Sequence, residues 1–299
     1  MIKILVTGAN GFLGKSFLKE LSKEGNLLFS LSRTCGDYKV SLQEEIPDFK
    51  ESFNLVIHAA GKAHSVPKTE IEKEQFYNTN VIGTANLLKG LEKFILPKEF
   101  VFISSVSVYG QETGSNISED HPLLAQDSYG LSKIQAEQLI VDWCRVNKIT
   151  CTILRLPLLV GKKPPGNLGA MIKALRKSYY FNIGKGEARK SMVLCKDVAL
   201  LIPVVSKVGG IYNLTDGFHP SFFELSKALS NNKKHLSLPL FWAKALGRIG
   251  DFLGDKAPIN SLRIKKITSD LIFDDSKARK LLNWKPELVL DYIKKENLD

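Results

Sequence analysis

Short apolar runs alternate with longer amphipathic stretches through the first half of the chain. The short runs have the length and the β-branched content of buried strands, and they cover residues 2–6, 27–31, 54–58, 99–103 and 150–154. The longer stretches carry apolar residues at helical spacing, and the clearest of them cover residues 13–22, 78–91 and 128–146. Strands that alternate with helices predict an α/β fold in which a doubly wound parallel sheet is covered by helices.

This regular pattern loosens after the fifth strand. A proline-proline-glycine triplet at residues 164–166 is a strong breaker of regular structure, and the units beyond it are shorter and less regular. We therefore expect a domain over residues 1–162 and a smaller part over residues 163–299. The smaller part is expected to be partly interleaved with the first domain and to cap the edge of the sheet.

The composition is that of a globular chain with a sizeable core. Its 299 residues are 44% hydrophobic, which is ample for one large domain or for a larger and a smaller one. The first apolar run is far too short for a signal peptide, and no window approaches the length of a membrane span, so we expect a cytoplasmic protein without one. The four cysteines are scattered, which predicts reduced thiols and no metal site.

The chain carries an excess of positive charge. Lysine and arginine exceed aspartate and glutamate by 42 − 31 = 11, which favours anionic partners. The basic residues are spread along the chain, without zinc-finger spacing, an RNA-binding motif or a long basic arm. We therefore expect phosphate-bearing small molecules rather than nucleic acid.

The segment Thr7-Gly8-Ala9-Asn10-Gly11-Phe12-Leu13-Gly14 follows the first strand and opens the first helix. Glycines at these positions allow a tight turn and let backbone N–H groups at a helix N-terminus approach a pyrophosphate. This arrangement predicts the nucleotide-binding loop of a Rossmann fold. Its expected cofactor contacts are Gly8, Asn10, Gly11, Phe12, Leu13 and Gly14.

The end of the second strand bears on which dinucleotide is bound. Arg33 lies nineteen residues after Gly14, close to where an acidic residue would bind the ribose hydroxyls of NAD. A guanidinium at this point suits the 2′-phosphate of NADP, so NADP is the expected cofactor. NAD is the alternative, in which Arg33 is a surface residue and Asp37 binds the ribose.

Tyr129 and Lys133 are four residues apart at the start of a predicted helix. This spacing places both side chains on one helical face. An ammonium group near the phenol is expected to lower the tyrosine pKa toward working pH, where the phenol exchanges a proton with an alcohol or ketone. A strand end rich in hydroxyls, Ser104 to Tyr109, lies upstream and strengthens this interpretation.

Together these motifs resemble the extended short-chain dehydrogenases/reductases, in the group of nucleotide-sugar epimerases and dehydratases. They are most similar to UDP-N-acetylhexosamine 4-ketoreductases and 4-epimerases. The similar segments follow the family order along nearly the whole chain: TGANGFLG (7–14), VIHAAG (56–61), NVIGT (80–84), SSVSVYG (104–110), YGLSK (129–133), RLPLLVG (155–161), YNLTDG (212–217) and DDSKARKLLNWKP (274–286). The resemblance implies a Rossmann domain, a small C-terminal substrate-binding domain and 4-keto chemistry on a UDP- or dTDP-linked hexose.

By position, the resemblance implies that Tyr129 is the acid/base, that Lys133 tunes it, and that Ser105 hydrogen-bonds the reacting oxygen. Tyr129 and Lys133 would also contact the cofactor, Lys133 through the nicotinamide ribose, while Tyr109 would only pack. The further implied cofactor contacts are His58, Ala59, Ala60, Asn80, Ser104 and Pro157.

The resemblance also implies substrate contacts at His64, Ser107 and Asn167. A solvent-facing side chain is an equal alternative for His64. An alignment on Asp197 puts Lys190, not Arg189, where similar enzymes carry the arginine that binds the diphosphate. The contact therefore stays open between Arg189 and Lys190, and a solvent-exposed basic turn is the alternative for both.

The residues after Ser105 bear on the reaction. Related dehydratases carry an Asp-Glu pair there, but this chain has Val106 and Ser107, neither of which transfers a proton usefully at neutral pH. Two reactions remain: reduction of a UDP-4-keto-6-deoxy-N-acetylhexosamine in surface polysaccharide synthesis, and 4-epimerisation of a UDP-hexose or UDP-N-acetylhexosamine with tightly bound NAD. Arg33 favours the reductase. A non-catalytic NADP-binding sensor is a minor alternative.

Two surfaces remain open. The resemblance implies a homodimer through helices near residues 78–91 and within 128–146. The aromatic and basic stretch over residues 241–253 has the composition of a helix that touches a membrane surface or a partner protein. Packing against its own domain is the more usual role of such a stripe.

Overall fold

The computed structural model describes residues 2–63, 67–231, 233, 235–253, 260–296 and 298. Seven parallel strands form its central sheet, in the order β11-β7-β5-β4-β1-β2-β3. Their bounds are β1 (Lys3–Thr7), β2 (Leu27–Ser32), β3 (Tyr38–Lys39), β4 (Leu55–His58), β5 (Glu99–Ser105), β7 (Thr150–Leu156) and β11 (Gly210–Asn213). The predicted doubly wound parallel sheet is confirmed. Its strand order reverses between β1 and β4, where open α/β sheets bind ligands.

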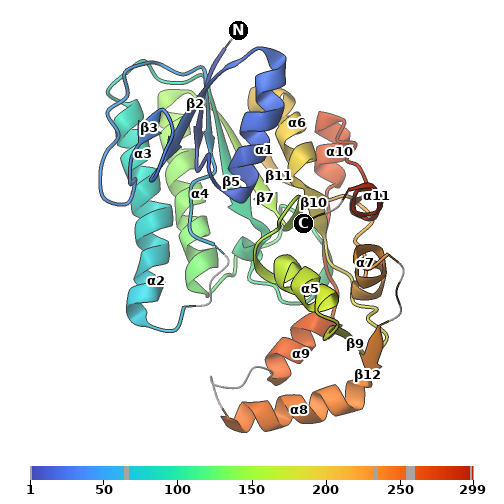
Figure 1. Cartoon of the computed structure of the whole chain (residues 1–299). Helices are drawn as coiled ribbons and strands as arrows, with labels where there is room; N and C mark the ends of the chain where they lie inside the picture. Colours follow the sequence, from blue (N-terminus) through green and yellow to red (C-terminus); the bar gives the residue numbers. More distant parts are fainter. Residues whose placement is uncertain are drawn as a thin grey trace.

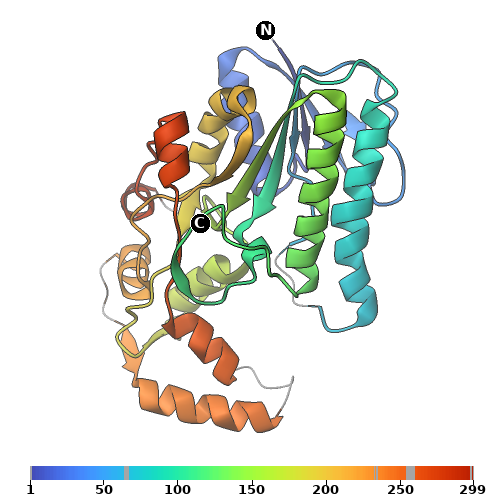
Figure 2. The ribbon, with the colours of Figure 1, turned by 180° about the vertical axis from the view of Figure 1, so that it is seen from behind.

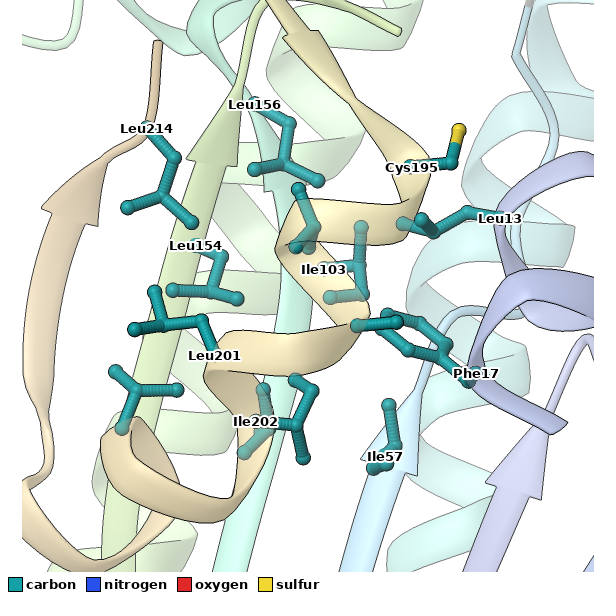
Figure 3. Packing of buried hydrophobic residues seen from close by; sticks show 14 of the residues in the cluster. Leu13, Phe17, Ile57, Ile103, Leu154, Leu156, Cys195, Leu201, Ile202 and Leu214 are labelled. Carbon is teal, nitrogen blue, oxygen red and sulfur yellow. The ribbon is translucent and has the colours of Figure 1, made fainter. Parts of the chain in front are cut away.

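Helices cover both faces of this sheet (Figures 1 and 2). One face carries α1 (Phe12–Leu21) and α6 (Cys195–Val208), and the other carries α3 (Gly83–Leu91) and α4 (Ser128–Asn147). Figure 3 shows the core under the first pair, where helix and strand side chains interdigitate: Leu13, Phe17, Leu201 and Ile202 against Ile57, Ile103, Leu154 and Leu156. Burial of these apolar side chains fixes the two helices on the sheet.

The helical layer on the second face begins earlier than the apolar pattern predicts. Helix α2 (Glu70–Tyr77) precedes a π-helical turn, η2 (Asn78–Ile82), which leads directly into α3. Thr69 caps α2 by accepting a hydrogen bond from the backbone N–H of Glu72 at 3.2 Å. The periodicity does not reveal α2 because Phe76 is its one buried residue.

Most of the C-terminal part lies beyond the carboxyl ends of the strands, whereas residues 276–284 pack beside α6 (Figures 1 and 2). Three small parallel sheets pair strands that are distant in sequence: β8 (Leu158–Val160) with β10 (Met192–Leu194), β9 (Phe181–Ile183) with β12 (Leu236–Leu238), and β6 (Gly114–Ile117) with β13 (Leu271–Phe273). Its helices are α5 (Gly166–Arg176), α7 (Phe222–Leu229), α8 (Leu240–Leu253), α9 (Ser261–Thr268), α10 (Ser276–Leu282) and α11 (Val289–Lys295). Two 3₁₀ turns, η1 (Ser22–Glu24) and η3 (Val106–Tyr109), complete the elements.

The chain passes between the two parts more than once. Residues 195–213 return to the large sheet as α6 and β11, and β6 leaves it to pair with β13. A division of the chain into 1–162 and 163–299 therefore assigns α6 and β11 to the C-terminal part by sequence, although both pack with the first domain. As a domain boundary, residue 162 stays a prediction.

Candidate active site

The glycine-rich loop between β1 and α1 packs backbone against backbone. Gly8 has a φ of +66°, and a Cβ atom on it would lie 2.6 Å from the backbone N of Ala60. A Cβ atom on Gly14 would lie 2.2 Å from the carbonyl oxygen of Gly8. The loop thus presents the N-terminus of α1, where backbone N–H groups attract a pyrophosphate. Phe12 and Leu13 pack their side chains against the core, so any cofactor contact of theirs would use the backbone.

A cavity of about 670 Å³ opens beside this loop, where the strand order reverses. Its walls include six of the expected cofactor residues: Gly8, Asn10, Gly11, Arg33, Ala59 and Ala60. The opposite wall adds residues that no motif marks in the sequence, among them Leu42, Gln43, Gln75 and Thr79. The volume is within the usual range of small-molecule sites. The backbone packing of the glycine loop and the cavity beside it fit a dinucleotide.

Arg33 and Asp37, the two candidates for cofactor selection, take different positions. Arg33 follows β2 directly, is exposed and lines the cavity. Asp37 accepts hydrogen bonds from the hydroxyl and the backbone N–H of Ser30, both at 2.7 Å, and these bonds hold the Asp37 pKa below its usual range. The Asp37 carboxylate already has partners in β2, which favours Arg33 as the residue that meets the ribose.

The His58 side chain belongs to the scaffold, so any cofactor contact of His58 would use its backbone. Its Nδ1 atom lies 2.7 Å from Oγ1 of Thr7, and its Nε2 atom lies 2.9 Å from Oγ1 of Thr84. Burial, with a smaller effect of the charge on Lys133, lowers the His58 pKa to about 3. The ring is therefore neutral and joins β1, β4 and α3, while the following Ala59 lines the cavity.

Asn80 and Ser104 also direct their side chains into the protein. The side-chain oxygen of Asn80 accepts the backbone N–H of Lys62 at 2.7 Å, and its amide nitrogen donates to Ser132 at 2.8 Å. Asn80 therefore fixes the loop after β4 to α4. The Ser104 hydroxyl donates to the Glu137 carboxylate in the interior, so a cofactor contact of Ser104 would have to use its backbone.

Ser105, Tyr129 and Lys133 come together where β5 meets α4. Ser105 ends β5, and its hydroxyl lies 3.1 Å from the Ser107 hydroxyl and hydrogen-bonds the Tyr129 phenol. Tyr129 lies in the first turn of α4. Lys133 follows one turn later, and its Nζ donates to the Ile103 carbonyl at 2.9 Å. The three residues predicted to be catalytic therefore share one site at the carboxyl end of a central strand.

Burial controls the protonation of this group. It raises the pKa of Tyr129, and the hydrogen bond from Ser105 opposes this only in part. It lowers the pKa of Lys133 to about 8, although the negative charge of Glu137 acts in the opposite direction. Desolvation is the largest effect on the phenol and raises its pKa, opposite to the lowering expected from Lys133. The Lys133 Nζ lies over the Phe102 ring, 4.6 Å from its centroid. Tyr129 keeps its proton at neutral pH.

A buried ion pair between α4 and β7 lies next to these residues. Arg155 Nη2 lies 2.8 Å from Glu137 Oε2, and the two side chains are 4% and 5% exposed. Arg155 also donates to the Tyr109 hydroxyl at 3.2 Å, which in turn donates to Asn213 at 2.7 Å. Tyr109 is thus a packing residue, as expected. Glu137 follows Lys133 by four residues, a spacing that places both on one face of α4. The pairing of Glu137 with Arg155 of β7 has no local signal in the sequence.

The two basic candidates for the diphosphate contact are bound by backbone carbonyls. The Arg189 guanidinium donates to the carbonyls of Phe218 at 2.6 Å and His219 at 3.1 Å. The Lys190 ammonium donates to two carbonyls at the end of α9, at 2.8 and 2.9 Å, and burial lowers its pKa. Arg189 is the more exposed of the two and lines a second cavity of about 750 Å³. The choice between them stays open.

The other expected contacts are dispersed. Asn167 is exposed in the first turn of α5, Pro157 lies between β7 and β8, and Ser107 hydrogen-bonds Ser105. His64 lies outside the described residues. Of the three that the structure describes, Ser107 is the one that lies beside Ser105.

Comparisons with known proteins agree with this geometry. The model of the NAD dependent epimerase/dehydratase family matches residues 4–214. A UDP-glucose 4-epimerase of Vibrio cholerae is 26% identical, over 96% of this chain and 92% of that protein. An N-acetyl-alpha-D-glucosaminyl-diphospho-ditrans,octacis-undecaprenol 4-epimerase of Escherichia coli O157:H7 is 28% identical, over 92% and 88%. Among solved structures, a UDP-N-acetylglucosamine 4-epimerase from Bacillus cereus superimposes with a TM-score of 0.75 at 22% identity, over 99% and 98% of the chains.

Loss of the Glu137 charge tests the buried pair. We expect Glu137→Gln to lower the free energy of unfolding by about 3 to 5 kcal/mol, because it leaves Arg155 buried without its counter-ion. Asp142→Asn on the same helix is the matched control, since it breaks an exposed pair with Arg145 that contributes at most about 1 kcal/mol. Urea unfolding of both variants measures the difference. Equal, small losses would show that the pair does not support the site.

Proposed function

Because this chain belongs to the NAD-dependent epimerase/dehydratase family, we propose that it is an NADP-dependent enzyme that acts at C4 of a nucleotide-linked sugar. The proposed reaction is the reduction of a UDP-4-keto-6-deoxy-N-acetylhexosamine. The observation that carries this proposal is the group of Ser105, Tyr129 and Lys133 at the end of β5. Val106 and Ser107 follow it, without the acid and base that a 4,6-dehydration needs.

Each residue of the group has a defined task in this proposal. Tyr129 donates its proton to the C4 oxygen, and Ser105 orients that oxygen through a hydrogen bond. Lys133, whose pKa is about 8, keeps a positive charge near the reacting oxygen at neutral pH. The glycine loop and Arg33 would hold the dinucleotide, which supplies a hydride when bound. Together the hydride and the Tyr129 proton convert the ketone into an alcohol.

Tyr129 can serve either reaction, because a reductase needs it as a proton donor and an epimerase uses it first as a base and then as an acid. The preference for reduction rests on the expected cofactor. Arg33, which lines the cavity, suits the 2′-phosphate of NADP. A reductase releases and replaces this cofactor at every turnover. The relatives named as 4-epimerases favour the second candidate, a 4-epimerase that retains NAD. A non-catalytic sensor is the weakest alternative, because the catalytic group is intact.

The reaction is tested with purified protein, NADPH and a UDP-4-keto-6-deoxy-N-acetylhexosamine. We expect NADPH oxidation that depends on the sugar, and Tyr129→Phe is expected to slow it about 10²- to 10⁴-fold through loss of the proton donor. NADPH binding should be nearly unchanged in this variant. Interconversion of UDP-GlcNAc and UDP-GalNAc with bound NAD and no net NADPH use would favour the epimerase instead.

Cofactor choice is tested separately by fluorescence titration with NADPH and NADH. We expect Arg33→Ser to weaken NADPH binding about tenfold or more, because a charge-assisted contact to the 2′-phosphate is lost, and to leave NADH binding nearly unchanged. Lys39→Ser, an exposed change at the end of β3, is the control. An unchanged ratio in Arg33→Ser, with weaker NADH binding in Asp37→Asn, would assign the ribose contact to Asp37 and the cofactor to NAD.

A further inference from the structure

Helix α8 buries its small residues and exposes its large ones. Ala243, Gly247 and Gly250 are buried and, at positions i, i+4 and i+7, share one side of the helix. This side packs against α9, since a Cβ atom on Gly247 would lie 2.7 Å from Cδ1 of Ile264 and 3.1 Å from the backbone N of Ser261. The close fit of small residues fixes how α8 is rotated, and it directs the bulky side chains away from the protein.

The exposed side of α8 is strongly apolar. Phe241, Trp242, Ile249 and Phe252 are 73%, 59%, 58% and 93% exposed, and Leu246 is also exposed. At about 100° per residue these five fall within an arc of roughly 140°. In Figures 1 and 2, α8 lies at the lower margin of the molecule with α9 on its upper side. A contiguous apolar face of this kind marks an interaction surface.

Positive charge borders this face. Residues 240–253 and 260–268 contain five basic residues and one acidic residue. Among the residues that the structure describes, no carboxylate pairs with Lys244, Arg248 or Lys265. Aromatic and aliphatic side chains flanked by cations are the composition of a helix that lies in the interface of an anionic bilayer. A second copy of the chain fits less well, because a twofold contact through α8 would bring these cations together.

We propose that α8 binds the surface of a membrane that contains anionic lipids, with its axis in the membrane plane and its apolar face at the boundary between headgroups and acyl chains. The helix has 14 residues, too few to span a bilayer, and no helix in the described part of the chain has the length and apolar content to do so. Because α8 lies on the side of the molecule toward which the strands run (Figure 1), this contact turns the carboxyl edge of the sheet toward the membrane.

Trp242 provides a built-in probe of this contact. Of the three tryptophans, Trp143 and Trp284 are 9% and 5% exposed, so solvent-sensitive emission comes mainly from Trp242. Full-length protein is mixed with vesicles of phosphatidylcholine, with and without phosphatidylglycerol. We expect a blue shift and co-flotation with the anionic vesicles, with affinity at least about tenfold weaker for phosphatidylcholine alone or at high salt. Trp242→Phe should lose the shift and keep the flotation.

Matched variants distinguish binding through α8 from nonspecific binding of the protein to vesicles. The double variant Ile249→Glu/Phe252→Glu is expected to weaken vesicle binding at least about tenfold, and Lys244→Ala/Arg248→Ala should weaken binding to anionic vesicles alone. Ile95→Glu/Ile71→Glu, on other exposed positions, should bind as the unmodified protein does. Unchanged thermal unfolding and NADPH binding exclude misfolding. Absence of anionic vesicle binding, or a dimer that the Ile249/Phe252 variant converts to monomers, would overturn the proposal.

Discussion

The buried ion pair between Glu137 of α4 and Arg155 of β7 determines how α4 lies on the sheet. Two charges removed from water are costly unless their remaining hydrogen-bonding groups are satisfied, and here Ser104 and Tyr109 satisfy them. The pair therefore fixes α4 to β5 and β7 together. Because Lys133 lies one turn before Glu137, the same constraint places the ammonium group at the end of β5.

The site depends on this constraint because its chemistry depends on burial. Lys133 and Tyr129 lie where the sheet ends and the C-terminal part begins. Desolvation disfavours the charged form of each side chain, so it raises the pKa of Tyr129 and lowers the pKa of Lys133. In the proposed reaction Tyr129 and Ser105 handle a single proton at one oxygen of the sugar, and the neighbouring Val106 offers no second acid or base. The cavity beside the glycine loop has room for the proposed dinucleotide.

Local sequence patterns predicted the elements and motifs that depend on neighbouring residues. The five strands, α1, α4, the glycine loop and the Tyr129–Lys133 spacing all follow from short-range periodicity or motif, and the structure places them as expected. The apolar periodicity did not predict the polar helix α2, because Phe76 is its one buried residue. Contacts that join distant segments, such as Glu137 with Arg155 or β9 with β12, carry no local signal. The position of His58 at the end of an apolar strand does not reveal the two threonines that hold its ring.

The orientation of α8 could not be predicted from its large apolar residues. These residues are exposed because the small residues of α8 pack against α9 instead. NADPH with deuterium at both C4 positions of the nicotinamide tests the proposed hydride transfer to the sugar most directly. With a UDP-4-keto sugar as substrate, we predict one deuterium at C4 of the product sugar, detected by mass spectrometry and NMR. Sugar conversion that leaves no deuterium at C4 would contradict this proposal.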